Sequence, residues 1–483
     1  METTTVEPVA AAAAAPRRFE DLPGPRGLPW FGNFHQLETS RVHLQFEQWC
    51  HQYGPYFKLR LGGPVLVVGD HEVVASVLRN RPDTFNRTPR LNQIWLEMGL
   101  PPGVFGANGD PWRRQRRMVM AGFDPAHVKR YFPSLQQVAG RLARRWQTAA
   151  REGTTIDLQS DLMRYTVDTI AGLAFGSDVN TLESDHDVIQ QHLDRIFPAL
   201  STRLIAPVPV WRYWRGKSDR ELDRGVAEVN AAVDRFIEQA RARMAADPEL
   251  RERPQNLLEA MLAAADQPDS GIDDTVVAGN VVTMLLAGED TTANTIAWMI
   301  HLLWRHPDML ARATEEVRRV VDGGAAPTWD AMAQLEFVEA CAHETMRLKP
   351  VAPILTFRAG EETVVGDVTV PAGTIVICLM RRDSVSDDHV PDAKRFNPER
   401  WLPGDGPAVD AGSAKRLSMP FGAGPRICPG RYLALLEMKM AMATVLSRFE
   451  IESVATPEGG EVREHFSFTM TPVGLRMRLG ERV

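Results

Sequence analysis

The stretch Phe421-Gly-Ala-Gly-Pro-Arg-Ile-Cys-Pro-Gly430 decides how the fold of this chain is interpreted. An apolar helical pattern follows it at once, so Cys428 is predicted to lie just before a helix N-terminus. There the positive end of the helix dipole and free backbone N–H groups favour a thiolate over a thiol. Gly422 and Gly424 permit a tight turn and close approach to a flat ligand, and Gly430 leaves room at the helix start.

Arg426 places a fixed cation two residues from the sulfur. A thiolate in a glycine-rich turn could serve as the axial ligand of a haem iron, and the neighbouring arginine could pair with a haem propionate. A free cysteine in a turn is the simpler alternative. The full spacing Phe-x-x-Gly-x-Arg-x-Cys-x-Gly favours the first interpretation, and it resembles the haem-binding loop of the cytochrome P-450 family. The resemblance implies haem b, with Cys428 on the iron and Phe421, Gly422, Arg426 and Gly430 around it.

Composition and length describe a globular protein with a large core. Of 483 residues, 44% are hydrophobic and 24% are charged, and the net charge of -7 argues against a nucleic-acid partner. Length alone would suggest two or three domains. Because no linker-like segment follows residue 40, we expect a single domain over 21–483, preceded by a disordered tail over 1–20.

Cysteine usage and the N-terminus indicate the compartment. Four scattered cysteines are too few for a disulfide framework or a CxxC zinc site, which suggests a reducing environment. The first nine residues carry no lysine or arginine, and the apolar stretch Val9–Ala15 is too short to span a bilayer. We therefore expect a cytoplasmic, bacterial-type monomer without a membrane anchor.

A long helix is predicted over 273–304, and its interior contains Ala287-Gly-Glu-Asp-Thr-Thr after an apolar run. Glycine and short polar residues in mid-helix cost stability, which invites a functional explanation. Gly288 would admit a cofactor plane, Thr291 can bond back to the carbonyl of Ala287, and Asp290 can supply protons. The alternative is a kink with a satisfied buried acid. The string resembles the oxygen-activating segment of the same family, which implies a hydrogen-bonding role for Thr291 and a proton relay through Asp290.

Two further segments resemble propionate-binding elements of the family. Trp112 and Arg116 are four residues apart in a predicted helix and share a face, as in the family's Trp-x-x-x-Arg element. A solvated basic face is the alternative. Arg358, at the end of a strand predicted over 352–358, matches a second propionate-binding position. Three neighbouring arginines then point elsewhere and could dock an acidic redox partner: Arg113, Arg114 and Arg117.

Glu344 and Arg347 are three residues apart on another predicted helix. In most proteins such a pair lies on the surface and contributes little. Together with Arg400, however, the pair resembles the structural Glu–Arg–Arg triad that fastens the loops behind the haem in this family.

The substrate pocket is the least constrained part of the interpretation. Residues 84–110 are expected to form a long connection, whose apolar residues either wall the substrate or pack the loop onto itself. Hairpins are predicted over 362–379, turning at Pro371–Gly373, and over 462–480, with the tip of the second in the pocket. The candidate lining residues are Leu91, Ile94, Trp95, Met284, Val351, Ile354, Leu355, Phe466 and Phe468.

These observations predict a mainly α protein with small β-sheets, in which haem lies between the long central helix and the helix that follows the cysteine loop. The resemblance implies an O2-activating monooxygenase that hydroxylates or epoxidises an apolar small molecule. Electrons would come from NAD(P)H through a separate ferredoxin and ferredoxin reductase or a flavoprotein reductase. A peroxide-driven peroxygenase would be expected to lack the acid–alcohol pair, and a haem-binding sensor or carrier would need no proton relay. The sequence does not choose a substrate among terpenoids, steroids, fatty acids and polyketides.

Overall fold

The structure, a computed structural model, describes residues 15–176, 178–184, 188–321, 325–403 and 414–482. Most of these residues are helical, as expected. The α-helices are α1 (Val42–Tyr53), α2 (His71–Arg79), α3 (Pro89–Glu97), α4 (Gly109–Gly122), α5 (Pro125–Glu152), α6 (Leu158–Phe175), α7 (Val188–Ile205), α8 (Lys217–Ala246), α9 (Leu257–Ala265), α10 (Asp274–Arg305), α11 (Pro307–Val320), α12 (Trp329–Ala333), α13 (Glu336–Leu348) and α15 (Arg431–Arg448).

Four small sheets accompany the helices. A five-stranded sheet has the order β2-β3-β9-β6-β4, with only the β3–β9 pair parallel. The others have the orders β1-β8-β7, β10-β13-β5 and β11-β12. The strands are β1 (Arg17–Arg18), β2 (Tyr56–Arg60), β3 (Pro64–Val68), β4 (Phe85–Asn86), β5 (Ile156–Asp157), β6 (Ile354–Ala359), β7 (Thr363–Val365), β8 (Val368–Val370), β9 (Ile375–Leu379), β10 (Phe449–Ala455), β11 (Glu464–Ser467), β12 (Thr469–Pro472) and β13 (Arg476–Glu481).

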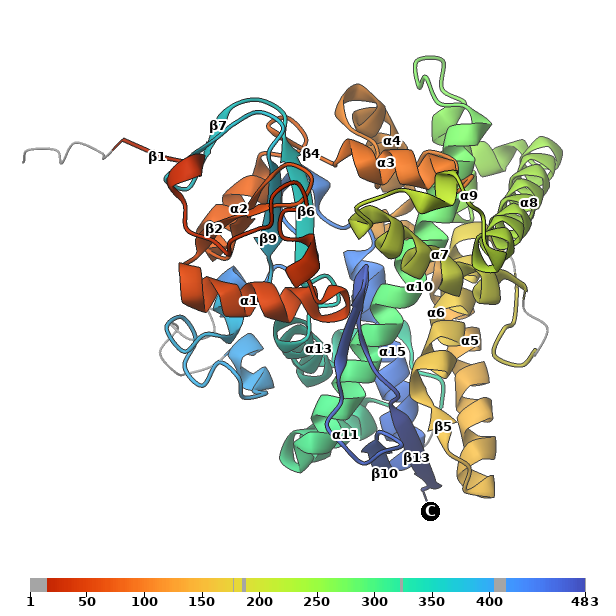
Figure 1. The fold of residues 1–483 in the computed structure, drawn as a ribbon. Helices are drawn as coiled ribbons and strands as arrows, with labels where there is room; N and C mark the ends of the chain where they lie inside the picture. Colours follow the sequence, from red (N-terminus) through yellow and green to blue (C-terminus); the bar gives the residue numbers. More distant parts are fainter. Residues whose placement is uncertain (1–14, 177, 185–187, 322–324, 404–413, 483) are drawn as a thin grey trace, which may run out of the picture.

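Helix α10 runs through the middle of the molecule. Figure 1 shows it and α15 between the five-stranded sheet on one side and helices α5 to α9 on the other. The side chain of Asp273 caps its first turn by accepting from the N–H of Val276, and nearly all of the following apolar residues are buried. It packs against α6, α13 and α15. The predicted long helix is confirmed, and the helix that carries Cys428's loop lies beside it.

Two expectations about local structure were wrong. Residues 84–110 are not a long loop, because they contain β4, α3 and the start of α4. Residues 362–379 are not one hairpin either. The hairpin is β7–β8 and turns at Gly366, whereas β9 joins the five-stranded sheet.

The expected disordered tail over 1–20 is wrong at its C-terminal end. Arg17 and Arg18 pair in parallel with β8, the Arg17 guanidinium bonds Asp367 at 2.8 Å, and Phe19 is buried. Residues 1–14 lie outside the described residues. The ordered part of the chain therefore includes residue 17.

Two surface properties bear on function. Among the described residues, no helix combines the length and the apolar composition that crossing a membrane requires.

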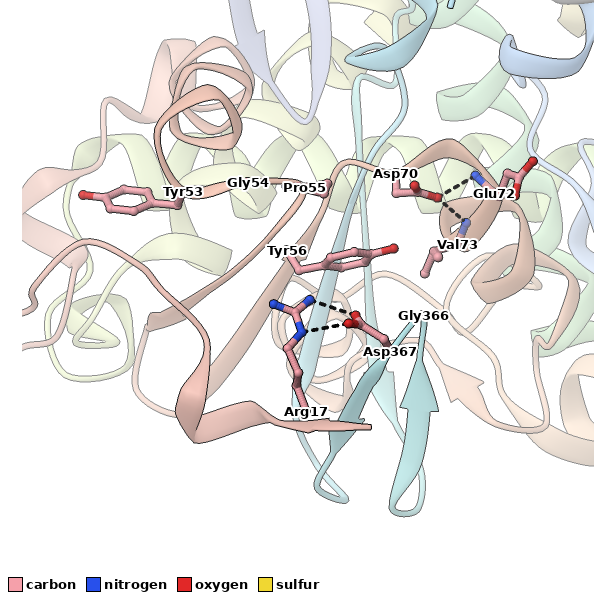
Figure 2. A pocket seen from close by; sticks show the side chains of 10 residues that line it. All are labelled: Arg17, Tyr53, Gly54, Pro55, Tyr56, Asp70, Glu72, Val73, Gly366 and Asp367. Atoms are coloured by element: carbon pink, nitrogen blue, oxygen red, sulfur yellow. Dashed lines mark hydrogen bonds and ion pairs between the residues drawn. The ribbon is translucent and has the colours of Figure 1, made fainter. Parts of the chain in front are cut away.

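A surface pocket of about 460 Å³ lies beside β1 and the start of α2, lined by Tyr56, Asp70, Asp367 and their neighbours (Figure 2). It contains none of the residues predicted to bind haem or substrate.

Candidate active site

The Cys428 loop is built as its glycines require. Gly422 and Gly424 both have positive φ angles, 72° and 70°, and the N–H of Cys428 donates to the carbonyl of Phe421 at 2.9 Å. A Cβ on Gly424 would lie 2.6 Å from the Cα of Arg79, so this glycine lets the loop approach α2 rather than a ligand. Gly430 is the N-cap of α15, as the sequence predicted for the residue after the cysteine turn.

Cys428 is half-buried, and opposing forces act on its thiol. Burial raises its pKa, while a hydrogen bond from the Gly430 N–H and the charges of Arg116 and Arg431 lower it. The net direction is upward, so the helix terminus alone does not produce the expected thiolate. A metal ion bound to the sulfur changes this balance, because a coordinating thiol loses its proton outright.

Two of the predicted propionate-binding residues lie directly against this loop. The Arg116 guanidinium donates to the carbonyl of Ile427 at 2.6 Å. The Arg426 guanidinium lies over the Trp112 ring, 4.6 Å from its centroid, and donates to the carbonyl of Ala107. The structure therefore brings Trp112, Arg116 and Arg426 together.

Two arginines that sequence reasoning missed complete this group. The Arg87 guanidinium lies over the Phe105 ring at 4.1 Å, and its Nε donates to the carbonyl of Phe105. Arg81 is buried over the Phe357 ring at 4.6 Å and donates to the carbonyl of Ala423 in the cysteine loop. Nothing in the local sequence marks either residue, because the fold alone brings them to the loop.

Arg81, Arg87, Arg116 and Arg426, which we call the arginine cluster, have no acidic partner. None of the four forms an ion pair with a carboxylate in the part of the chain that the structure describes, and Arg426 Nε is buried without a hydrogen bond. Burial and the neighbouring arginines lower the pKa of Arg87 and of Arg426 to about 9. Uncompensated cations beside a cysteine loop fit a ligand that carries carboxylates, as haem b does.

Arg358, the other predicted propionate residue, pairs through its backbone with Asn86 beside Arg87, but its side chain makes no hydrogen bond with this cluster among the described residues. Its side chain is exposed on β6 beside Gly373. The β6 residue that faces the cluster is its neighbour Phe357, whose ring lies under both Arg81 and Arg87. The structure does not bring Arg358 together with the other candidates.

Helix α10 has one face that borders open space. Ala287 is exposed and Gly288 and Thr291 are partly exposed, whereas Leu286, Glu289, Asp290 and Thr292 are buried. The Thr291 hydroxyl donates to the carbonyl of Ala287 at 2.8 Å, as predicted. A Cβ on Gly288 would lie 3.1 Å from the side chain of Ile170, so that glycine serves the packing of α10 on α6 rather than the approach of a cofactor.

Asp290 is buried and held from two sides. Its Oδ1 accepts from the Asn294 amide at 2.7 Å, and its Oδ2 accepts from the hydroxyl of Thr469 at the start of β12. Burial raises the pKa of Asp290, and these two bonds lower it by less. No ion pair to Asp290 occurs among the described residues. A carboxyl of this kind retains its proton to a higher pH than an ordinary aspartate does.

A second buried acid, Glu437 of α15, was not anticipated. Burial raises its pKa well above the ordinary value, and the hydroxyl of Thr292 hydrogen-bonds to it. Thr292 immediately follows Thr291 on α10, so two proton-retaining carboxyl groups, Glu437 and Asp290, flank this segment.

The predicted triad is assembled and fully buried. Arg347 bonds both carboxylate oxygens of Glu344 at 2.7 Å, and Arg400 Nε lies 3.4 Å from Glu344 Oε1. Arg347 also donates to three backbone carbonyls, including that of Ala393 at 2.7 Å, and the Trp401 indole donates to Glu344 at 2.9 Å. The alternative of a weak surface ion pair is therefore wrong.

The candidate pocket residues divide into several groups. Leu91, Ile94, Trp95, Met284 and Phe468 belong to one apolar cluster, in which Trp95 also donates to the carbonyl of Pro101. The other four lie elsewhere: Ile354 and Leu355 pack in two clusters of the sheet region, Phe466 contacts His43, and Val351 accepts from the N–H of Met470. The hairpin predicted over 462–480 is confined to β11 and β12, with Phe468 at its turn, because β13 pairs with β10 instead; its reach into the substrate pocket stays a prediction.

Phe468 stacks on Phe197 of α7 at 4.8 Å and meets Phe105 edge-on at 5.9 Å. Phe105 is one of the apolar residues of 84–110 that the sequence offers either as a substrate wall or as loop packing, whereas Phe197 looks like ordinary core from the sequence. Because Phe105 also lies under Arg87, the aromatic trio adjoins the arginine cluster.

Comparisons with known proteins agree with this geometry. The chain is 28% identical to cyclooctat-9-en-7-ol 5-monooxygenase of Streptomyces melanosporofaciens, over 94% of each chain. It is 27% identical to pentalenene oxygenase of Streptomyces avermitilis, over 95% of this chain and 97% of the other. The crystal structure of the cytochrome P450DA heme domain superposes with a TM-score of 0.81, at 25% identity, over 96% of this chain and 98% of the other.

A sequence profile of the family described as Cytochrome P450 matches residues 22–478. The match includes the cysteine loop, the Thr291 segment and the buried triad. The chain therefore belongs to the cytochrome P450 family of haem-containing monooxygenases.

Proposed function

We propose that this P450 hydroxylates or epoxidises an apolar small molecule held beside α10. The observation that carries the proposal is the aromatic trio of Phe105, Phe197 and Phe468, which comes from three distant segments and lies next to the arginine cluster. Apolar pockets of this kind orient a substrate through contact area rather than charge. The two Streptomyces relatives, named for cyclooctat-9-en-7-ol and pentalenene, support an alicyclic hydrocarbon-like substrate.

Each part of the site has a role in this proposal. Cys428 would hold the haem iron, and the arginine cluster with Trp112 would hold the propionates. When bound, haem supplies the iron chemistry that activates O2. Thr291 offers a hydroxyl on the open face of α10, and Asp290 behind it stores a proton that a water chain can carry forward.

Thr469 is a positioning residue in this scheme. It follows Phe468 directly, so one hairpin turn contacts both the aromatic trio and the proton-storing acid. A substrate that displaces the Phe468 ring would also move the hydroxyl that holds Asp290. Proton delivery would then respond to whether the pocket is filled.

P450s use redox partners, and we propose a separate ferredoxin with its reductase, or a flavoprotein reductase, supplied by NAD(P)H. Arg114 and Arg117 are exposed on α4, the helix whose Arg116 contacts the Cys428 loop, and they suit an acidic partner. Arg113 suits it less, because it already pairs with Asp83 and with Asp110 at 2.8 Å. A single catalytic domain, a monomeric state and a cytoplasmic location stay predictions.

Product formation tests the proposal. Haem-loaded protein would be supplied with a surrogate ferredoxin, its reductase, NADPH and isotopically labelled O2, with alicyclic hydrocarbons as substrates. We expect a spin-state shift on substrate binding and one labelled oxygen atom in the product. Product that forms only with added peroxide would indicate a peroxygenase. Binding without any product in either condition would indicate a carrier, and both outcomes contradict the proposal.

A further inference from the structure

Three metal-binding side chains meet at the end of α2 that is farther from the Cys428 loop. His71 is the first residue of α2, Asp383 lies in a 3-10 turn, and His389 closes the turn after it. One ligand atom from each lies within 4.8 Å of the other two. Asp383 is 3% exposed and His71 11%, whereas His389 is 34% exposed and leaves the cluster open on one side.

Hydrogen bonds within the protein satisfy Asp383 but leave one ring nitrogen of His71 without a partner. Asp383 Oδ2 accepts two hydrogen bonds, one from the backbone N–H of His71 at 2.8 Å and one from His71 Nδ1 at 3.0 Å. His389 Nε2 lies 3.7 Å from the same oxygen, beyond hydrogen-bond reach. His71 Nε2 is buried and has no hydrogen-bond partner among the described residues. Two imidazoles therefore converge on one carboxylate oxygen without completing a network.

We propose that His71, Asp383 and His389 bind a divalent transition-metal ion, Zn²⁺ being the best fit. Imidazole and carboxylate ligands lie about 2.0–2.2 Å from Zn²⁺, which places neighbouring ligand atoms about 3.3–3.5 Å apart in a tetrahedral site. The two separations at Asp383 Oδ2, 3.0 and 3.7 Å, fall on either side of that value. Side-chain movements that bring all three ligand atoms, now within 4.8 Å of one another, to this spacing would complete the geometry, with water in the remaining position.

Glu72 supplies a suitable outer partner. With the ion on His71 Nδ1, the ring's Nε2–H would donate to Glu72 only after Glu72 Oε1, which lies 3.9 Å from Nε2, moves closer. Histidine ligands usually donate their second N–H to a carboxylate in this manner. Figure 2 shows Glu72 beside Asp70 at the start of α2, on the rim of the surface pocket.

The positive charge of Arg382 would weaken binding of a cation, but its side chain does not occupy the ligand oxygen. Its Nη1 lies 2.5 Å from Asp383 Oδ1, so it does not occupy Oδ2, which accepts the backbone N–H of His71 and lies near both imidazoles. A bound ion would fasten the N-terminal end of α2 to the 383–389 turn. Because the other end of α2 contacts Gly424 through Arg79, the ion would steady a helix that supports the cysteine loop.

Calorimetric titration of the haem-loaded protein with Zn²⁺ tests this site. We expect one Zn²⁺ per chain and a rise in melting temperature on binding. His389→Ala should weaken binding at least about tenfold, whereas His51→Ala, at an exposed histidine of α1, should leave it unchanged. Because His389 lies in a partly exposed turn, its loss is not expected to unfold the protein.

Arg382→Gln provides a second and opposite readout. Removing the cation that competes for Asp383 should tighten Zn²⁺ binding severalfold, which an adventitious surface histidine site would not show. The proposal is overturned if no stoichiometric Zn²⁺ binds, or if binding survives His389→Ala unchanged.

Discussion

Arg87→Met tests which arginine binds a haem propionate. The structure indicates Arg87, whereas the sequence suggests Arg358. Arg87 Nε is occupied by the carbonyl of Phe105, and neither Nη group bonds any described residue, so both are available to a propionate. A hydrogen bond to a charged group is worth about 1.5–3 kcal/mol. Losing one such bond should weaken haem retention about 10- to 150-fold, at 1.4 kcal/mol per factor of ten.

The assay is haem transfer from the variant to an excess of a haem-scavenging protein. Arg358→Met is the matched control, since it removes the same charge from a residue that the structure places outside the arginine cluster. We expect faster haem loss from Arg87→Met and wild-type behaviour from Arg358→Met. The reverse pattern, or no change in either variant, would refute the assignment of the propionate site.

Three further predictions concern buried groups. Arg347→Lys loses the planar guanidinium that forms two hydrogen bonds with Glu344. The free energy of unfolding of the haem-loaded protein, measured in urea, should fall by about 3–5 kcal/mol. An unchanged free energy of unfolding would contradict the role of the buried pair. Because burial raises the pKa of Glu437, its contribution to stability is full below the pKa of an unfolded glutamate and is lost as pH rises through the raised value. Melting temperatures of Glu437→Gln should therefore depend less on pH than those of the wild type, and parallel curves would refute this. Thr469→Val removes a donor to Asp290, and the product formed per NADPH consumed should fall about tenfold or more while substrate binding persists; unchanged coupling would exclude the positioning role.

Short-range patterns predicted the parts of the site that depend on local geometry. The glycine turn before α15, the back-bond from Thr291 to Ala287 and the pairing of Glu344 with Arg347 all lie within a few residues along the chain. Fixed spacing determines their relative placement once the local element forms. The structure confirms these features.

Arg358 shows how a single-residue uncertainty changes a site. The strand itself was predicted, but adjacent residues of a strand face opposite sides, and the sequence did not fix which side faces inward. The register of β6 turns Phe357 toward Arg81 and Arg87 and leaves Arg358 exposed.

Other site residues depend on tertiary structure. Arg87 and Phe105 lie in a segment whose prolines and glycines predict a loop. Pro89, however, occupies the first turn of α3, where proline is compatible with a helix. Thr469 reaches Asp290 across 179 positions of sequence, and no local pattern specifies such a contact.

The measurement that tests the central claim most directly is the absorbance difference spectrum of the reduced protein with and without carbon monoxide. Thiolate ligation through Cys428 predicts a strongly red-shifted Soret band that Cys428→Ala abolishes, while Cys378→Ala, at a buried core cysteine, retains it. A band at the position typical of imidazole ligation, or a red-shifted band that survives Cys428→Ala, would contradict the account.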